Sequence, residues 1–200
     1  MMVIFQQFLF LVATYLIASI PFGLILTKFF TGKDIRELGS KNIGATNVTR
    51  IAGKKLGLAT LILDCSKGAI MVIIARFNFY QIDHFHLFLT LVSFIAVMAH
   101  IYPIYLNFKG GKGVATTLAT LMVLDFTTGF LTLCFWILTF SVTRISATSS
   151  LVAIFSSIIF SKFYNAPFEQ IALCTILFII TTIKHKENLI RILDKKESKF

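Results

Sequence analysis

Residues that can bind phosphate are concentrated in three short polar segments between long apolar stretches. The segments are 39–50 (GSKNIGATNVTR), 107–113 (NFKGGKG) and 185–191 (HKENLIR). Glycine backbone, hydroxyls, amides and cations are the groups that hold a phosphate in proteins. The three segments therefore predict a site for phosphorylated ligands, provided that the fold brings them together.

The first segment combines turn-forming glycines with closely spaced polar side chains. Gly39 and Gly44 permit tight turns, and the polar residues are Ser40, Asn42, Thr46, Asn47 and Arg50. A guanidinium can bind a phosphate through two parallel hydrogen bonds, so Arg50 is a candidate clamp. The structural alternative is a capped turn, in which Ser40 or Asn42 closes the start of the next helix.

The second segment is a glycine loop followed at once by an apolar stretch. Gly110, Gly111 and Gly113 would let backbone N–H groups curve around an anion, and the helix N-terminus would add partial positive charge. Lys109 or Lys112 would supply a full charge. The spacing GxxxxGK[ST] is absent, so nucleotide hydrolysis is not predicted. A flexible basic loop is the alternative interpretation.

The third segment places further donors after the last apolar stretch. His185, Asn188 and Arg191 fall near one face if the helix continues through them. A histidine at a membrane edge is more often an interfacial residue than a catalyst, so His185 alone would indicate little.

The rest of the chain is too apolar for a soluble domain. Of its 200 residues 56% are hydrophobic and 14% charged, and the mean hydropathy is +0.84. Twenty-two phenylalanines and three prolines favour helices in lipid. We expect an all-α polytopic membrane protein with one domain over residues 1–200, free cysteines in the apolar stretches, and neither a metal nor another cofactor.

Seven transmembrane helices are predicted, at 8–26, 56–74, 87–106, 114–124, 126–142, 150–163 and 168–183. The interval 114–142 could instead be one long helix, but a hairpin is favoured, because Asp125 followed by two threonines and a glycine suits a turn. Asp64 and Lys67 are spaced to pair on one helix face, and with His100 they are expected to face protein.

An odd number of spans places all three polar segments on one side of the membrane. Sixteen of the nineteen basic residues then share that side, which the positive-inside rule makes cytoplasmic, with the amino terminus outside. Six spans would send the basic tail, about 185–200, to the opposite side. Topology explains most of the net charge of +10, so no nucleic-acid partner is expected, while membrane lipid headgroups are a plausible contact of the tail.

At these segments the chain resembles the acyl-phosphate:glycerol-3-phosphate acyltransferase (PlsY) family of bacterial membranes. The resemblance runs from Ser19 to Arg191, and its specific parts are GSKNIGATNVTR, KGGKGVAT and HKEN. It implies a seven-span inner-membrane enzyme with a cytoplasmic site. The implied reaction moves a fatty acyl group from acyl phosphate to the sn-1 hydroxyl of glycerol 3-phosphate. Lysophosphatidate and phosphate would result, as the first step of phospholipid synthesis, and an upstream enzyme would supply the acyl phosphate.

The resemblance also implies which residues form the site. Those implied to bind the substrate phosphates are Ser40, Asn42, Thr46, Asn47, Arg50, Gly110, Gly111, Lys112, Gly113, Ser150, His185 and Asn188. Four of them, Ser40, Arg50, Lys112 and His185, are expected to be catalytic, although a substrate phosphate could replace a protein base. Ser149 is the alternative to Ser150. Two positions depart from the family: Lys41 replaces a usual glycine, and Ala147 a frequent serine.

A transporter or channel for an anionic solute is the alternative from another class, since it too would gather cations around glycine loops. The sequence has no internal repeat, and its cations collect at span ends, which favours the enzyme. None of the four histidines begins an HxxxxD pairing, so the acyl-CoA route that uses this dyad is not predicted.

Overall fold

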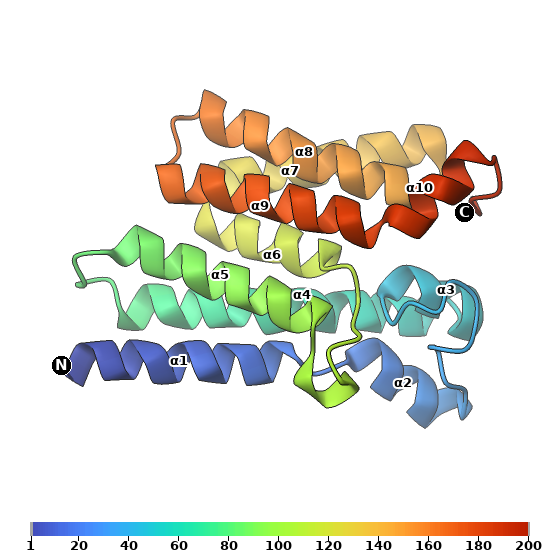
Figure 1. Ribbon diagram of the computed structural model, residues 1–200, viewed down its shortest axis with the longest axis horizontal. Coiled ribbons are helices and arrows are strands. Elements are labelled where there is room, and N and C mark those ends of the chain that lie inside the picture. Colours follow the sequence, from blue (N-terminus) through green and yellow to red (C-terminus); the bar gives the residue numbers. More distant parts are fainter. Residues whose placement is uncertain (1, 200) are drawn as a thin grey trace.

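The structure is a computed structural model that describes residues 2–199, and it is a bundle of helices that run along a common direction (Figure 1). No strand occurs within these residues, so the predicted all-α fold is confirmed. The elements are α1 (Met2–Ala18), α2 (Phe22–Thr31), α3 (Ala45–Ala52), α4 (Lys54–Asn78), α5 (Phe85–Ile101), the 3-10 turn η1 (Ile104–Leu106), α6 (Val114–Leu124), α7 (Phe126–Thr143), α8 (Ser146–Phe163), α9 (Phe168–Lys184) and α10 (Lys186–Leu193).

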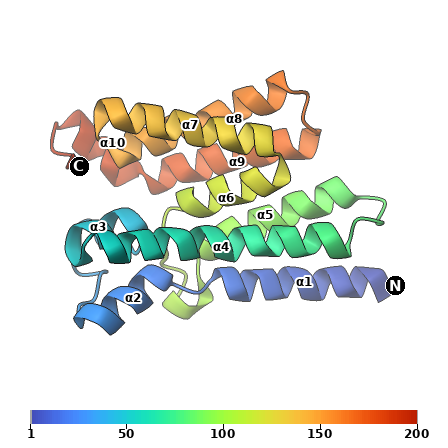
Figure 2. The ribbon, with the colours of Figure 1, turned by 180° about the vertical axis from the view of Figure 1, so that it is seen from behind.

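The long helices form two groups that meet at α6 and where α5 packs against α9. Helices α1, α4 and α5 pack together on one side, and α7, α8 and α9 on the other. Helix α6 lies between the groups and contacts both α4 and α7, as the front and rear views agree (Figures 1 and 2).

Five helical segments are long and apolar enough to cross a membrane within the described part of the chain. They are Met2–Thr31, Lys54–Asn78, Phe85–Leu106, Phe126–Thr143 and Ser146–Phe163. Helices α9 and α10 add a sixth if their bend of 60° lies inside one span, and α6, with 11 residues, is shorter. A polytopic membrane protein is therefore supported, while the count of seven crossings stays a prediction.

The first predicted span, 8–26, lies within the candidate span Met2–Thr31, but that span is divided into two helices. Helix α1 ends at Ala18 and α2 begins at Phe22, with Pro21 between them. Proline has no N–H and its ring clashes with the preceding turn, so a regular helix does not pass through it. The carbonyl of Ile20 at this break accepts a hydrogen bond of 2.9 Å from Lys67 Nζ in α4.

The predicted break at Asp125 is confirmed. Helix α6 ends at the preceding residue, α7 begins at the next one, and the two helices run antiparallel (Figure 1). The Asp125 carboxylate accepts hydrogen bonds from the backbone N–H groups of Thr127 and Thr128, which caps α7. The hairpin returns the chain toward the end of the bundle from which α6 started.

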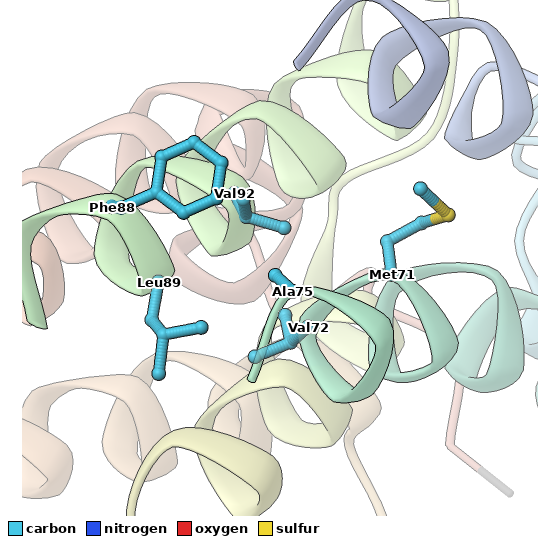
Figure 3. Close-up of a cluster of buried hydrophobic side chains, with 6 residues drawn as sticks. All are labelled: Met71, Val72, Ala75, Phe88, Leu89 and Val92. Carbon is cyan, nitrogen blue, oxygen red and sulfur yellow. The ribbon is translucent and has the colours of Figure 1, made fainter. Parts of the chain in front are cut away.

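An apolar cluster fixes α4 against α5 (Figure 3). Its buried members are Met71, Val72 and Ala75 from α4, and Phe88, Leu89 and Val92 from α5. Further along α4, Gly68 allows α6 to approach closely, since a Cβ there would lie 2.6 Å from Thr116 Cγ2. Together these contacts set where the loop between α5 and α6 must lie.

Candidate active site

All three polar segments meet at one cavity of about 200 Å³. It lies at the end of the bundle that carries α3 and α10 (Figure 1). Ten of the twelve predicted site residues line it: Ser40, Asn42, Thr46, Asn47, Arg50, Lys112, Gly113, Ser150, His185 and Asn188. Segments separated by more than 100 residues in the sequence thus contribute to one site.

Lys112 is the most strongly perturbed cation in the cavity. Its Nζ donates a hydrogen bond to Asn188 Oδ1, which joins the second segment to the third. Burial, followed by the positive charge of Arg191, lowers the pKa of Lys112 from 10.5 to about 8, and the carboxylate of Glu197 acts in the opposite direction. The ammonium is therefore poorly solvated and suited to an anionic partner.

His185 is buried at the bend between α9 and α10, with 3% of its surface exposed. Its Nδ1 lies 2.8 Å from the carbonyl oxygen of Thr181, which assigns the proton to Nδ1 and leaves Nε2 as an acceptor. Burial, followed by the charge of Lys112, lowers the pKa of His185 to about 4. The imidazole is consequently neutral near pH 7.

The carboxyl-terminal tail closes one side of the cavity with a carboxylate. The side chain of Glu197 is only 6% exposed. It accepts hydrogen bonds from Asn188 Nδ2 at 2.7 Å and from Arg191 Nε at 2.6 Å. Arg50 donates to the backbone carbonyl of Ser198 at 3.0 Å, and burial lowers the pKa of its guanidinium, which nonetheless remains charged.

Two asparagines of the first segment support its backbone. The side chain of Asn47 donates to the carbonyl oxygens of Leu38 and Asn42, each at 2.9 Å, and accepts from the N–H of Ser40 at 3.0 Å. Asn42 Oδ1 accepts from the N–H of Gly44 at 3.0 Å. Asn47 therefore organises the loop that presents Ser40 to the cavity.

Of the two candidate serines, Ser150 lines the cavity and Ser149 does not, which favours Ser150 as the site residue. Ser150 Oγ accepts a hydrogen bond of 3.2 Å from Trp136 Nε1. Its neighbour Ser146 also lines the cavity, and Ser146 Oγ lies 3.2 Å from Thr46 Oγ1. Ser146 thus places a hydroxyl beside Ala147, where the family often has serine.

The N–H groups of Gly110 and Gly111 bond within the protein, whereas the sequence predicted that they would curve around an anion. Their N–H groups donate to the carbonyl oxygens of Ile101 and His100, at 3.1 and 3.0 Å, and neither glycine lines the cavity. A Cβ on either glycine would overlap atoms of His100. These residues therefore seat the loop on the end of α5 and do not point free N–H groups at the cavity.

The N-terminus of α6 faces the cavity. Gly113 precedes the helix with a φ of +82°, a conformation that favours glycine, and no side chain caps the helix. Val114 and Ala115, in the first turn, line the cavity. Unpaired N–H groups in a first turn carry partial positive charge, which adds to that of Lys112.

One part of the cavity wall is apolar. Leu61 from α4, Leu118 from α6, and Leu133 and Trp136 from α7 line it. The cavity therefore joins a cationic pocket to a surface that suits a hydrocarbon chain.

Sequence reasoning missed several lining residues. Glu197 lies in a basic tail with no recognisable spacing, and Ser146 precedes a segment that was expected to start later. Asp64 and His100 also line the cavity. The sequence could have indicated these two residues, because polar groups inside an apolar span usually face protein or a functional cavity.

The fold and the cavity together define an integral membrane protein of several apolar helices with a cationic pocket suited to phosphorylated, lipid-like ligands. The chain belongs to the family described as glycerol-3-phosphate acyltransferase, whose profile matches residues 8–195.

Curated relatives of the same family align with this chain over nearly their whole length. The glycerol-3-phosphate acyltransferase of Ehrlichia ruminantium is 44% identical over 197 residues, which cover 98% of this chain and 96% of that protein. The protein of the same name from Bartonella henselae is 39% identical over 195 residues, with 98% and 92% covered.

Two solved structures share the fold. Both are of PlsY, an integral membrane glycerol 3-phosphate acyltransferase. Its glycerol 3-phosphate form matches with a TM-score of 0.91 and 33% identity, covering 98% of this chain and 96% of that one. Its lysophosphatidic acid form matches with a TM-score of 0.88 and 32% identity, covering 98% and 95%.

Proposed function

We propose that this chain transfers a fatty acyl group from an acyl phosphate to the sn-1 hydroxyl of glycerol 3-phosphate, giving lysophosphatidate and inorganic phosphate. The observation that carries the proposal is the convergence of Arg50, Lys112 and the N-terminus of α6 on one cavity with an apolar wall. Such a cavity offers cations and helix N–H groups to phosphate beside an apolar surface for a hydrocarbon chain. The chain's family supports glycerol 3-phosphate as the acceptor.

The reaction requires positioning more than covalent catalysis. An acyl phosphate is a mixed anhydride, so phosphate is already a good leaving group. We assign Arg50, Lys112 and Ser40 to the phosphates, with Ser150 and Asn188 beside them. Fixed cations and first-turn N–H groups then stabilise the negative charge that develops as the hydroxyl oxygen attacks the acyl carbonyl carbon.

The attack forms an ester C–O bond and breaks the bond from the acyl carbon to the phosphate oxygen, which leaves with the electron pair. The proton of the hydroxyl needs an acceptor. His185 has a pKa of about 4, whereas a phosphate monoester has its second pKa near 6, roughly two units higher. We assign the proton to a substrate phosphate oxygen and give His185 Nε2 an orienting role.

We place the site on the cytoplasmic side of a bacterial inner membrane, with seven crossings, α6 included, and the amino terminus outside. The distribution of basic residues supports this orientation. An antiparallel α6–α7 hairpin agrees with it, because the hairpin brings α8 back to the end that carries the cavity.

The test is an assay of purified protein in detergent with acyl phosphate and glycerol 3-phosphate. We expect lysophosphatidate and phosphate in equal amounts. Absence of both products would reject the proposal. If lysophosphatidate forms from acyl-CoA or from acylated acyl carrier protein, but not from acyl phosphate, the acceptor stands and the proposed donor is rejected.

Arg50→Ala and Lys112→Ala test the assigned cations. Each should lower kcat/KM by at least about 100-fold, because a group that faces developing charge is removed. Lys109→Ala is the matched control, since Lys109 is exposed and does not line the cavity. Folded Arg50→Ala and Lys112→Ala variants with kinetics like those of Lys109→Ala would move the site elsewhere.

A further inference from the structure

A buried polar network lies behind the glycine loop, outside the groups assigned to the phosphates. Asp64 is 2% exposed, Lys67 5% and His100 4%. Lys67 Nζ pairs with Asp64 Oδ1 at 2.9 Å, and His100 Nδ1 lies 3.5 Å from the same oxygen. The network thus connects α4 to the end of α5.

The far side of His100 contacts the glycine loop. The carbonyl oxygen of His100 accepts the N–H of Gly111, and a Cβ added to Gly111 would overlap His100 Nε2. The imidazole ring therefore fills the space against which the loop backbone rests. The ring thus limits how closely the loop can approach the end of α5.

The backbone of Asp64 holds the chain on the other side of Lys112. Thr116 Oγ1, in the first turn of α6, donates to the carbonyl oxygen of Asp64 at 3.0 Å. The close approach of α4 and α6 at Gly68 fixes that contact. Lys112 consequently lies between Gly111 and Thr116, which bond to the backbone carbonyls of His100 and Asp64. The side chains of His100 and Asp64 lie against each other and fix the relative position of the two carbonyls.

We propose that Asp64 and His100, braced by Lys67, are positioning residues that hold the glycine loop so that Lys112 projects into the phosphate pocket. The inference rests on the proposed contact of Lys112 with a substrate phosphate. Neither Asp64 nor His100 needs to touch a reacting atom. A displacement of about 1 Å in a group that orients a substrate can cost about 100-fold in rate.

If His100 positions the loop through Gly111, the effects of substituting these two residues should not be additive. In His100→Asn, the amide retains a polar group toward Asp64 while the ring edge that faces Gly111 is lost. We expect Gly111→Ala and His100→Asn each to lower kcat/KM for glycerol 3-phosphate by about 10- to 100-fold, mainly through KM. In the His100→Asn background, adding Gly111→Ala should cost less than about threefold, because the overlap is gone.

A second variant separates positioning from charge balance. Removing Asp64 alone would leave the charge of Lys67 buried without a counter-charge, which destabilises a protein. The double variant Asp64→Asn with Lys67→Met removes both charges, and we expect a folded protein whose KM for glycerol 3-phosphate is still raised. A wild-type KM in this double variant would overturn the role of Asp64.

Two controls make each outcome decisive. Ser93→Ala alters another buried polar residue of α5, whose hydroxyl bonds only within the helix, and should leave KM unchanged. Lys112→Ala is measured in parallel: if it is fully active, the proposed site itself is wrong. If Lys112→Ala is inactive while the effects of His100→Asn and Gly111→Ala multiply, the site stands and the positioning network is rejected.

Discussion

The charge on Lys112 depends on its surroundings, and activity should reveal that dependence. Burial and Arg191 lower its pKa to about 8, so the ammonium is lost as the pH rises through that value. We expect kcat/KM for glycerol 3-phosphate, which reports the free enzyme, to fall on the alkaline side with an apparent pKa near 8. The measurement is a pH profile from about 6.5 to 9.5.

Lys112→Arg identifies the group responsible for the alkaline fall. A guanidinium stays charged over this range, so the variant should be less active but lose the fall near pH 8. Lys109→Arg, at the exposed neighbour, should keep the wild-type profile. If Lys112→Arg retains the same alkaline fall, another group titrates there.

The sequence predicted the types of residue in the cavity better than their individual contacts. Arg50, Lys112, His185 and Asn188 all line it, because glycines, cations and amides between apolar spans are recognisable as polar segments. The scaffold role of Asn47 was not predicted, since phosphate oxygens and backbone carbonyls both suit an amide. Only the folded loop shows which partner is within reach.

At the scale of elements, the turn before α3 contains a strained residue. Lys41 has a φ of +58°, in the left-handed region that favours glycine, and its side chain is exposed. A non-glycine residue in this conformation destabilises the folded state by about 1–2 kcal/mol. Glycine avoids that strain, but ordering its more flexible unfolded chain costs about 0.5–1 kcal/mol. We expect Lys41→Gly to raise the free energy of unfolding by about 0.5–1 kcal/mol, measured by reversible unfolding in mixed detergent micelles.

Lys109→Gly provides the comparison for this turn. Lys109 is also an exposed loop lysine, but its φ is not positive, so glycine there should be neutral or slightly destabilising. Equal shifts in the two variants would mean that charge, and not backbone strain, sets the stability at position 41.

Long apolar helices were predictable to within a few residues, and the irregular elements were not. Helix α6 matches its predicted bounds, and α7 differs from its own by one residue. The division of the first span at Pro21 was missed, although proline is the residue that divides helices. The bend of 60° between α9 and α10 lies at His185, which lines the cavity with Asn188, and it was not predicted from the sequence.

At the scale of the whole molecule, the site depends on the direction of every helix. Helices α5, α7 and α9 end near the segments that line the cavity, and α4, α6 and α8 begin there (Figure 1). A chain with one crossing fewer would separate His185 and Asn188 from Lys112. Parity could be argued from the sequence, but the packing that draws the segments into one cavity of about 200 Å³ required the structure.

Labelling of single cysteines in intact cells tests this arrangement in the membrane. In a variant without Cys65, Cys134 and Cys174, cysteine would replace the exposed residues Asp83, Lys109 or Lys196 one at a time. An impermeant maleimide should label position 83 from outside, and positions 109 and 196 only after the membrane is opened. These two positions flank the cavity from separate segments, so they must share a side if one pocket binds both phosphates. Labelling of position 196 but not 109 from outside would place the tail across the bilayer from the glycine loop, and no shared site could then form.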